Sequence, residues 1–137
     1  MIRFYNCLVN QHDYWLVGLA ALVCSLGALA SINLLHHVTF VRRSRAQWLT
    51  VTALASGSAI WATHFIAMLA FKPGIETGYS VNLTALSFIA AVALTGMAFA
   101  YTVQDVTRMN RAIGGAMVGG GIAAMHYTGM AAFQTWA

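Results

Sequence analysis

Long apolar segments separated by short polar ones run the length of this chain. The ten Asp, Glu, Lys and Arg residues all lie within the first 13 positions or in short segments around residues 42–45, 72–76 and 105–111. Each apolar segment between them is long enough for a helix to cross a hydrocarbon core of roughly 30 Å, which needs about 20 residues. The pattern predicts four transmembrane helices, over residues 14–35, 47–70, 79–101 and 112–133.

These segments show no regular alternation of apolar and polar residues, which the strands of a membrane barrel would require. Helices are then the structure that satisfies every backbone N–H and C=O group inside lipid. Composition agrees, since 60% of the residues are hydrophobic and only 7% are charged, against about a quarter charged in soluble domains. We therefore expect an all-α integral membrane helical bundle in which residues 1–137 form one domain.

The basic residues indicate the orientation of the bundle. They concentrate in two connecting segments, as Arg42, Arg43 and Arg45 in the first and Arg108 and Arg111 in the second, whereas only Arg3 and Lys72 lie on the other side. By the positive-inside rule the arginine-rich segments are cytoplasmic, so both ends of this chain are expected to be periplasmic. The net charge of +4 is thereby explained without a nucleic-acid partner.

A histidine and a methionine four residues apart occur twice in the apolar sequence. His64 and Met68 form the first pair, and His126 and Met130 form the second. On a helix this spacing places both side chains on one face, about one turn apart. The repeated unit is a helical hairpin whose second helix carries the pair, and two crossings per unit make the repeats parallel. Both pairs should therefore lie at one depth near the periplasmic face.

Small residues in the two pair-bearing helices predict that these helices approach closely. They are Ala55, Gly57 and Ala59 in the second span and Gly114, Gly115, Gly119, Gly120 and Gly121 in the fourth. Such residues let helix backbones come together in a membrane. Close approach would bring the two His-Met pairs into one site.

Two imidazoles and two thioethers suit copper, because soft thioether sulfur selects Cu(I). Alternatives remain open from the residues alone. A b-type haem held axially by His64 and His126 is one. A hydrogen bond from His64 to Thr128 or Tyr127, with methionines as packing, is another. Copper transport is a third. Enzymatic activity is not expected, because no Asp, Glu or Lys lies within the predicted spans to act as an acid or base.

The segment Met125-His126-Tyr127-Thr128-Gly129-Met130 resembles the signature of the MHYT domain. Residues 61–71 are similar to a second copy, with Thr63 in place of the first Met and Phe65-Ile66 in place of Tyr-Thr. The whole chain resembles the first two of three repeats in a domain of about seven spans. Because Thr63 stands at the corresponding position, Met125 has no counterpart in the first copy.

This resemblance implies a sensor module of the bacterial inner membrane, fused in other members to cytoplasmic cyclic-di-GMP domains or a DNA-binding regulator. It implies copper as the cofactor and a diatomic gas (oxygen, CO or NO) as the stimulus. Its implied ligands are His64, Met68, His126 and Met130, with Met125 as an extra. The expected partners are the lipid bilayer, the gas, a cytoplasmic output domain or the remaining repeat, and a second copy in a homodimer.

Overall fold

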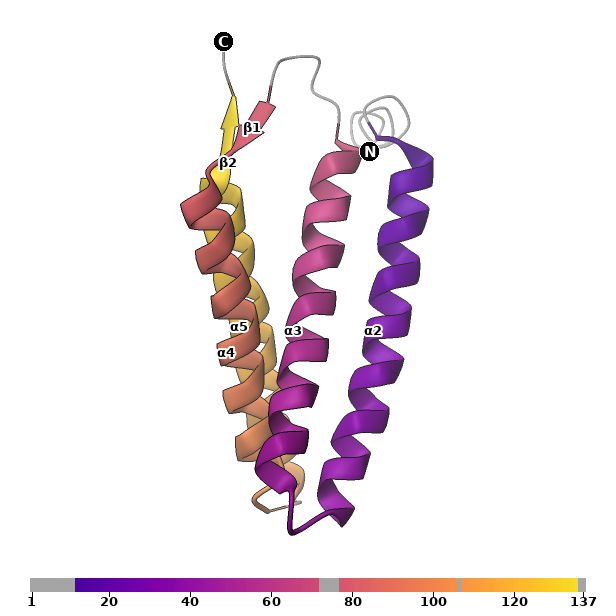
Figure 1. Cartoon of the computed structure of the whole chain (residues 1–137), viewed down its shortest axis with the longest axis vertical. Coiled ribbons are helices and arrows are strands. Elements are labelled where there is room, and N and C mark those ends of the chain that lie inside the picture. Colours follow the sequence, from indigo (N-terminus) through magenta and orange to yellow (C-terminus); the bar gives the residue numbers. More distant parts are fainter. Residues whose placement is uncertain (1–11, 72–76, 106, 136–137) are drawn as a thin grey trace.

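The structure is a computed structural model that describes residues 12–71, 77–105 and 107–135. The described residues form helices α2 (Tyr14–Phe40), α3 (Arg45–Ala70), α4 (Val81–Thr102) and α5 (Arg108–Ala132) and the short strands β1 (Thr77–Tyr79) and β2 (Phe133–Thr135). Figure 1 shows the helices running alongside one another as a bundle. The predicted all-α membrane bundle is confirmed.

Helices α2, α3 and α4 are each long and apolar enough to cross a membrane. Helix α5 has 25 residues but does not reach the same hydropathy, because glycines, Arg108 and Arg111 dilute its apolar residues. Helix α2 ends at Phe40 rather than at the predicted residue 35. Hydropathy marks only the lipid-embedded part of a helix, whereas backbone hydrogen bonding continues through the polar residues beyond it.

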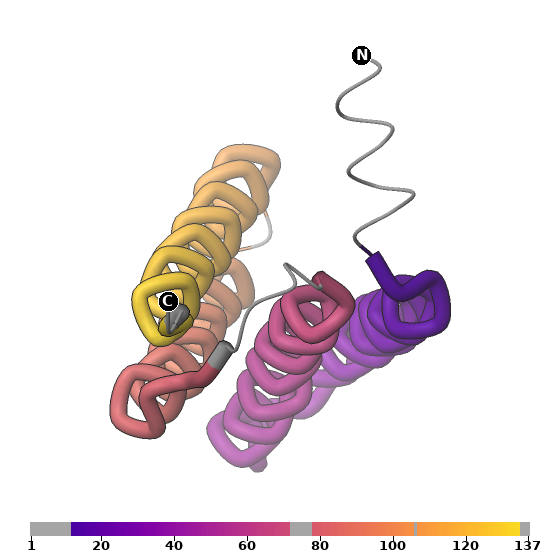
Figure 2. Tube along the Cα trace, turned by 90° about the horizontal axis from the view of Figure 1, so that it is seen from above, coloured from indigo at the N-terminus to yellow at the C-terminus, as the bar shows by residue number. Residues whose placement is uncertain are grey.

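The helices form two hairpins. Helix α2 packs on α3, α4 packs on α5, and α3 joins the hairpins by packing on α4 and touching α5. In the view from above, α2 and α5 lie on separate sides of the bundle (Figure 2). This arrangement matches the predicted pair of repeated hairpins. It leaves a hollow between α2 and α5, which is a cavity of about 400 Å³ lined by residues of both helices and of α3.

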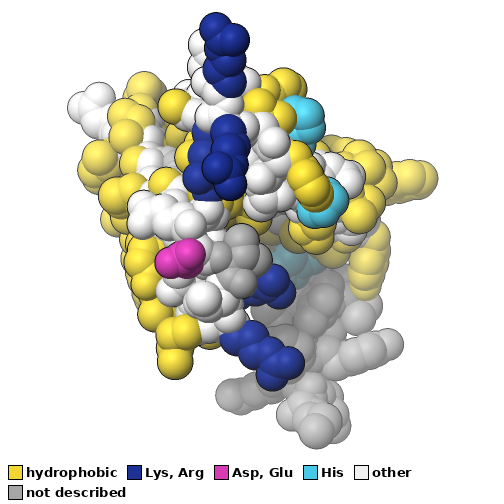
Figure 3. Space-filling view, turned by 90° about the horizontal axis from the view of Figure 1, so that it is seen from below, with side chains coloured by type: hydrophobic (Ala, Val, Ile, Leu, Met, Phe, Trp, Pro, Cys, Tyr) yellow, Lys and Arg dark blue, Asp and Glu magenta, His cyan; other side chains and the backbone are white. Residues whose placement is uncertain are grey.

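The two ends of the bundle differ in character. Strands β1 and β2 pair antiparallel at one end, with Tyr79 opposite Phe133, and we call it the sheet end. The opposite, arginine end carries the connections α2–α3 and α4–α5 (Figure 1), and basic side chains lie on its surface (Figure 3). Strands of three residues are too short for a periodic pattern, so this sheet was not predicted. Arg3 and Lys72 lie outside the described residues.

Glycines allow close helix contacts at only some of the predicted positions. A Cβ at Gly57 would lie 2.6 Å from the Val92 Cα atom, and one at Gly121 would lie 3.0 Å from the Leu94 Cβ atom. By contrast, nothing lies within 4 Å of such an atom at Gly115, Gly119 or Gly120. Val92 and Leu94 both belong to α4, so Gly57 and Gly121 serve packing on α4 and not the predicted close approach of α3 to α5. That prediction is wrong for Gly115, Gly119 and Gly120 as well, because they face no neighbouring helix in the described part of the chain.

Interhelical hydrogen bonds hold the first hairpin together and attach it to the second. The Ser56 hydroxyl donates to the Ser31 hydroxyl at 2.6 Å, which donates to the Gly27 carbonyl at 2.6 Å. The Trp61 indole donates to the Ser87 hydroxyl at 3.2 Å. Such bonds between membrane helices contribute about 0.6 kcal/mol each. They fix α3 between α2 and α4, and so set the direction in which His64 points.

Candidate metal centre

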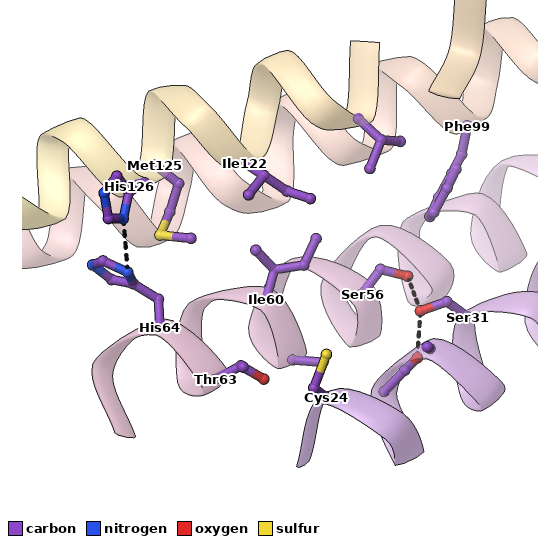
Figure 4. A pocket seen from close by; sticks show the side chains of 14 residues that line it. Cys24, Ser31, Ser56, Ile60, Thr63, His64, Phe99, Ile122, Met125 and His126 are labelled. Atoms are coloured by element: carbon purple, nitrogen blue, oxygen red, sulfur yellow. Dashed lines mark hydrogen bonds between the residues drawn. The ribbon is translucent and has the colours of Figure 1, made fainter. Parts of the chain in front are cut away.

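The rings of His64 from α3 and His126 from α5 meet between their two helices, where His64 is half-buried and His126 is exposed. Their Nδ1 atoms are 3.2 Å apart, and the ring centroids are 4.9 Å apart with the planes at 82°. Figure 4 shows the two rings facing each other across the gap between their helices. The structure therefore brings together the two histidines of the repeated motif, as their matching depth predicted.

Gly129 makes this approach feasible. It follows His126 by three residues, so both lie on one face of α5. A Cβ at position 129 would lie 2.7 Å from the His64 Nε2 atom, which is buried and makes no hydrogen bond among the described residues. The second motif thus provides the His126 ring and, one turn later, Gly129, whose lack of a side chain leaves room for the His64 ring.

The distance between the Nδ1 atoms suits a shared metal ion. A metal–nitrogen bond of about 2.0 Å in tetrahedral geometry places two ligand nitrogens about 3.3 Å apart. The same distance also suits a hydrogen bond in which one Nδ1–H donates to the other Nδ1 atom. The pair can therefore share a proton or, with both Nδ1 atoms deprotonated, direct two lone pairs at one cation.

Met68 and Met130 line a cavity of about 300 Å³ together with both histidines. We call it the sheet-end cavity. Met68 is half-buried and Met130 is exposed. Among the described residues, no group of three or more His, Cys, Asp or Glu side chains is placed to hold a metal ion. Any further protein ligand from this motif would therefore be a thioether.

His12 also lines the sheet-end cavity, although it lies outside the repeated motif. Its segment pairs with Phe71, and the Asp13 N–H donates to the Ala70 carbonyl at 2.9 Å. These contacts hold the start of α2 beside the end of α3. In the sequence His12 directly precedes Asp13, which is the N-terminal cap of α2. Its position in the sequence did not predict that it would border this cavity.

Met125 approaches the histidine pair from the other side. It is 1% exposed and lines a mid-bundle cavity of about 400 Å³ together with His64 and His126. Its side chain extends from α5 towards α3 beside the two rings (Figure 4). The three predicted methionine ligands thus all border the histidine pair, but they are divided between two cavities.

The other hydrogen-bond partners considered for His64 are engaged elsewhere or exposed. The Thr128 hydroxyl donates to the Ala124 carbonyl at 2.7 Å. The Tyr127 side chain is 73% exposed. The partner of His64 is therefore His126 itself.

Tyr79 of β1 packs among aromatic side chains at the sheet end. Its ring packs against Phe65 of α3 and Phe133 of β2, with centroids 5.6 Å apart in each case. Burial raises the pKa of the Tyr79 phenol above its ordinary value, because desolvation disfavours the charged form. The phenol is therefore neutral at physiological pH and acts here as an aromatic packing group.

Comparison with known families gives a match over more than half of the chain. The family described as "MHYT: Bacterial signalling protein N terminal repeat" matches residues 57–115 and 119–136. The two matched segments contain the two His-Met pairs, one in each. No solved structure matches the chain.

Three curated relatives align with nearly the whole chain. An "Uncharacterized signaling protein" of Caulobacter vibrioides is 43% identical over 98% of the chain. The "Bifunctional diguanylate cyclase/cyclic di-GMP phosphodiesterase MucR" of Pseudomonas aeruginosa is 38% identical over 91%. The "Cyclic di-GMP phosphodiesterase NbdA" of the same organism is 37% identical over 95%. The chain spans only 17%, 18% and 16% of these relatives' lengths.

Proposed function

Starting from the fact that this chain belongs to the MHYT family of bacterial signalling proteins, we propose that it is the sensing part of a membrane signalling protein and senses through a copper ion. His64 and His126 hold the ion, and thioether sulfur from Met68 and Met130 completes its coordination. Met125 is a reserve ligand on the other side of the pair. The chain is a sensor rather than an enzyme.

The 3.2 Å separation of the two Nδ1 atoms is the observation that carries this proposal. It agrees with two nitrogens on one tetrahedral ion. The methionines border the same pair, and a mixed imidazole and thioether set favours copper, with Cu(I) preferred by the soft sulfur. No other set of metal-binding side chains among the described residues is repeated in this way.

A diatomic gas such as oxygen, CO or NO is the proposed stimulus. The mid-bundle cavity, which is the hollow between α2 and α5, extends to the histidines, and it offers an apolar path for a small, lipid-soluble molecule. Gas binding at the ion would change its ligand geometry and hence the spacing of α3 and α5. Signalling requires that this change favour one of two helix arrangements.

The proposed location is the bacterial inner membrane, with the sheet end periplasmic and the arginine end cytoplasmic. MucR and NbdA carry cyclic-di-GMP activities in their printed names, so we propose a cyclic-di-GMP output domain on the cytoplasmic side. A remaining membrane repeat or a second copy of the chain would pack in the hollow between α2 and α5.

Geometry favours copper over a b-type haem. Axial ligands of a haem iron lie on opposite faces of the porphyrin, with nitrogens about 4 Å apart and the macrocycle between them. The rings of His64 and His126 are in direct contact, which leaves no slot for a porphyrin. Copper transport is less favoured, because transporters place broken helices or buried charges at mid-membrane, and the described mid-span residues are continuous helix.

Metal analysis of the chain purified from membranes tests the proposal. We expect about one copper per chain in the wild type and in His36→Ala, a matched histidine loss in the part of α2 near the arginine end. We expect almost none in His64→Ala and His126→Ala. Equal copper in all four proteins would overturn the site. An intense Soret band in copper-free protein would establish haem instead.

A further inference from the structure

A second cavity, of about 450 Å³, lies at the arginine end between the end of α2, the start of α3 and the end of α4. Its polar lining comes from Thr39, Arg42, Arg45 and Gln104. We propose that this cavity binds a phosphate-bearing anion, presented by an anionic lipid head group or free in solution. The proposal is independent of the copper site, which lies at the opposite end of the bundle.

Arg45 is held in place by one hydrogen bond and has a further donor to offer. Its Nη2 atom donates to the carbonyl of Val103 at the end of α4, which satisfies one of the unpaired carbonyls of that helix end. Its Nε atom is buried and makes no hydrogen bond among the described residues. A buried N–H on a cation is costly to leave unpaired, so this atom indicates a missing acceptor.

The start of α3 adds to the positive charge at the cavity. Arg45 is the first residue of the helix, where a cation is disfavoured because the helix N-terminus is itself partially positive. The first turn contains no acidic residue, and the Ser44 side chain makes no capping bond. An anion in the cavity would neutralise both the guanidinium and the helix terminus.

Arg42 provides the second guanidinium. It is exposed and lines the same cavity. Figure 3 shows basic side chains spread over this end of the molecule. Asp105 is the acidic residue described there, and it does not belong to the cavity lining. Planar guanidinium groups bind phosphate through paired N–H donors, and basic pockets between membrane helices bind lipid phosphates.

Lipid binding by the full chain provides the first arm of the test. The protein would be purified in an uncharged detergent, mixed with phosphatidylglycerol and phosphatidylcholine, and examined by native mass spectrometry. We expect phosphatidylglycerol to be retained in preference, and Arg42→Gln and Arg45→Gln each to weaken its binding by about fivefold or more. Arg43→Gln is the matched control, because Arg43 is an exposed neighbour outside the cavity lining. It should change binding by less than about twofold.

Calorimetry with inorganic phosphate in the lipid-free detergent provides the second arm. Arg42-dependent binding in this arm alone would identify free phosphate as the source, and in the lipid arm alone a lipid head group. Since Arg45→Gln also breaks the bond to Val103, the decision rests on Arg42→Gln with unchanged helix content by circular dichroism. If Arg42→Gln binds both ligands as Arg43→Gln does, or if neither ligand binds, the proposal is overturned.

Discussion

The imidazole of His64 lies against the backbone of Gly129 on the other hairpin, and a Cβ atom there would be 2.7 Å from its Nε2 atom. This contact places the ring within reach of His126, one turn earlier on α5. A glycine in the second motif therefore leaves the space that the His64 ring occupies beside His126. A substitution at Gly129 would therefore separate the two hairpins at this contact without removing a proposed ligand.

Gly129→Ala should push His64 away from α5 and separate the two Nδ1 atoms. Overpacking of this kind costs about 1–3 kcal/mol, and we expect most of the bound copper to be lost. Gly119→Ala is the control, since nothing lies near its would-be Cβ atom. Copper content and thermal stability of both variants in detergent would be measured. Full copper occupancy in Gly129→Ala would show that the close approach is not needed for binding.

Replacing the thioethers should weaken Cu(I) more than it weakens folding. Met-to-Leu changes conserve volume and cost less than about 1.5 kcal/mol. We expect Met68→Leu and Met130→Leu each to lower Cu(I) affinity by about tenfold or more, as measured by competition with a coloured Cu(I) chelator. Met97→Leu is the matched control, because Met97 lies on α4 outside the linings of both cavities at the pair.

Met125→Leu distinguishes the two sides of the histidine pair. If the ion lies towards the sheet end, this substitution leaves Cu(I) affinity within about twofold of the wild type. If Met125→Leu lowers Cu(I) affinity as much as Met68→Leu does, the ion lies towards the mid-bundle cavity instead. The same competition assay measures both variants.

Ser56→Ala should loosen α2 from α3. The substitution removes the donor of the 2.6 Å bond to Ser31, and we expect a loss of about 0.6 kcal/mol in unfolding free energy. Titration with a denaturing detergent would measure it. Ser25→Ala serves as the control, because the Ser25 hydroxyl donates to the Ala21 carbonyl of its own helix and not to another helix among the described residues. Equal stability of the two variants would contradict a role for the Ser56–Ser31 bond.

Tyr79→Phe should make the protein more resistant to alkali. Burial raises the pKa of the folded Tyr79 phenol above the ordinary value of 10.0. The unfolded chain therefore ionises first, and stability falls as the pH rises above about 10. Phenylalanine keeps the packing and cannot ionise, so the variant should lose less stability between about pH 9 and pH 11. Parallel melting curves for both proteins over this range would contradict the prediction.

Hydropathy located the helices because lipid demands a continuous apolar helix of a set length. The predicted spans overlap all four observed helices, yet α2 continues to Phe40 because hydrogen bonding does not stop at the lipid boundary. The three-residue strands β1 and β2 escaped prediction, since their pairing depends on where two helices end. The position of His12 beside the sheet-end cavity was not predicted either, because it depends on where α2 begins and α3 ends.

The repeated spacing determined, without coordinates, that His64 and His126 lie at one depth on parallel helices. It could not determine that their Nδ1 atoms stand 3.2 Å apart, or that Gly57 and Gly129 face a neighbour while Gly115 and Gly119 do not. Depth follows from position along a helix of regular rise. The direction in which a side chain faces depends on the rotation of its helix about the helix axis. For α3, only the combined packing with α2, α4 and α5 decides that rotation.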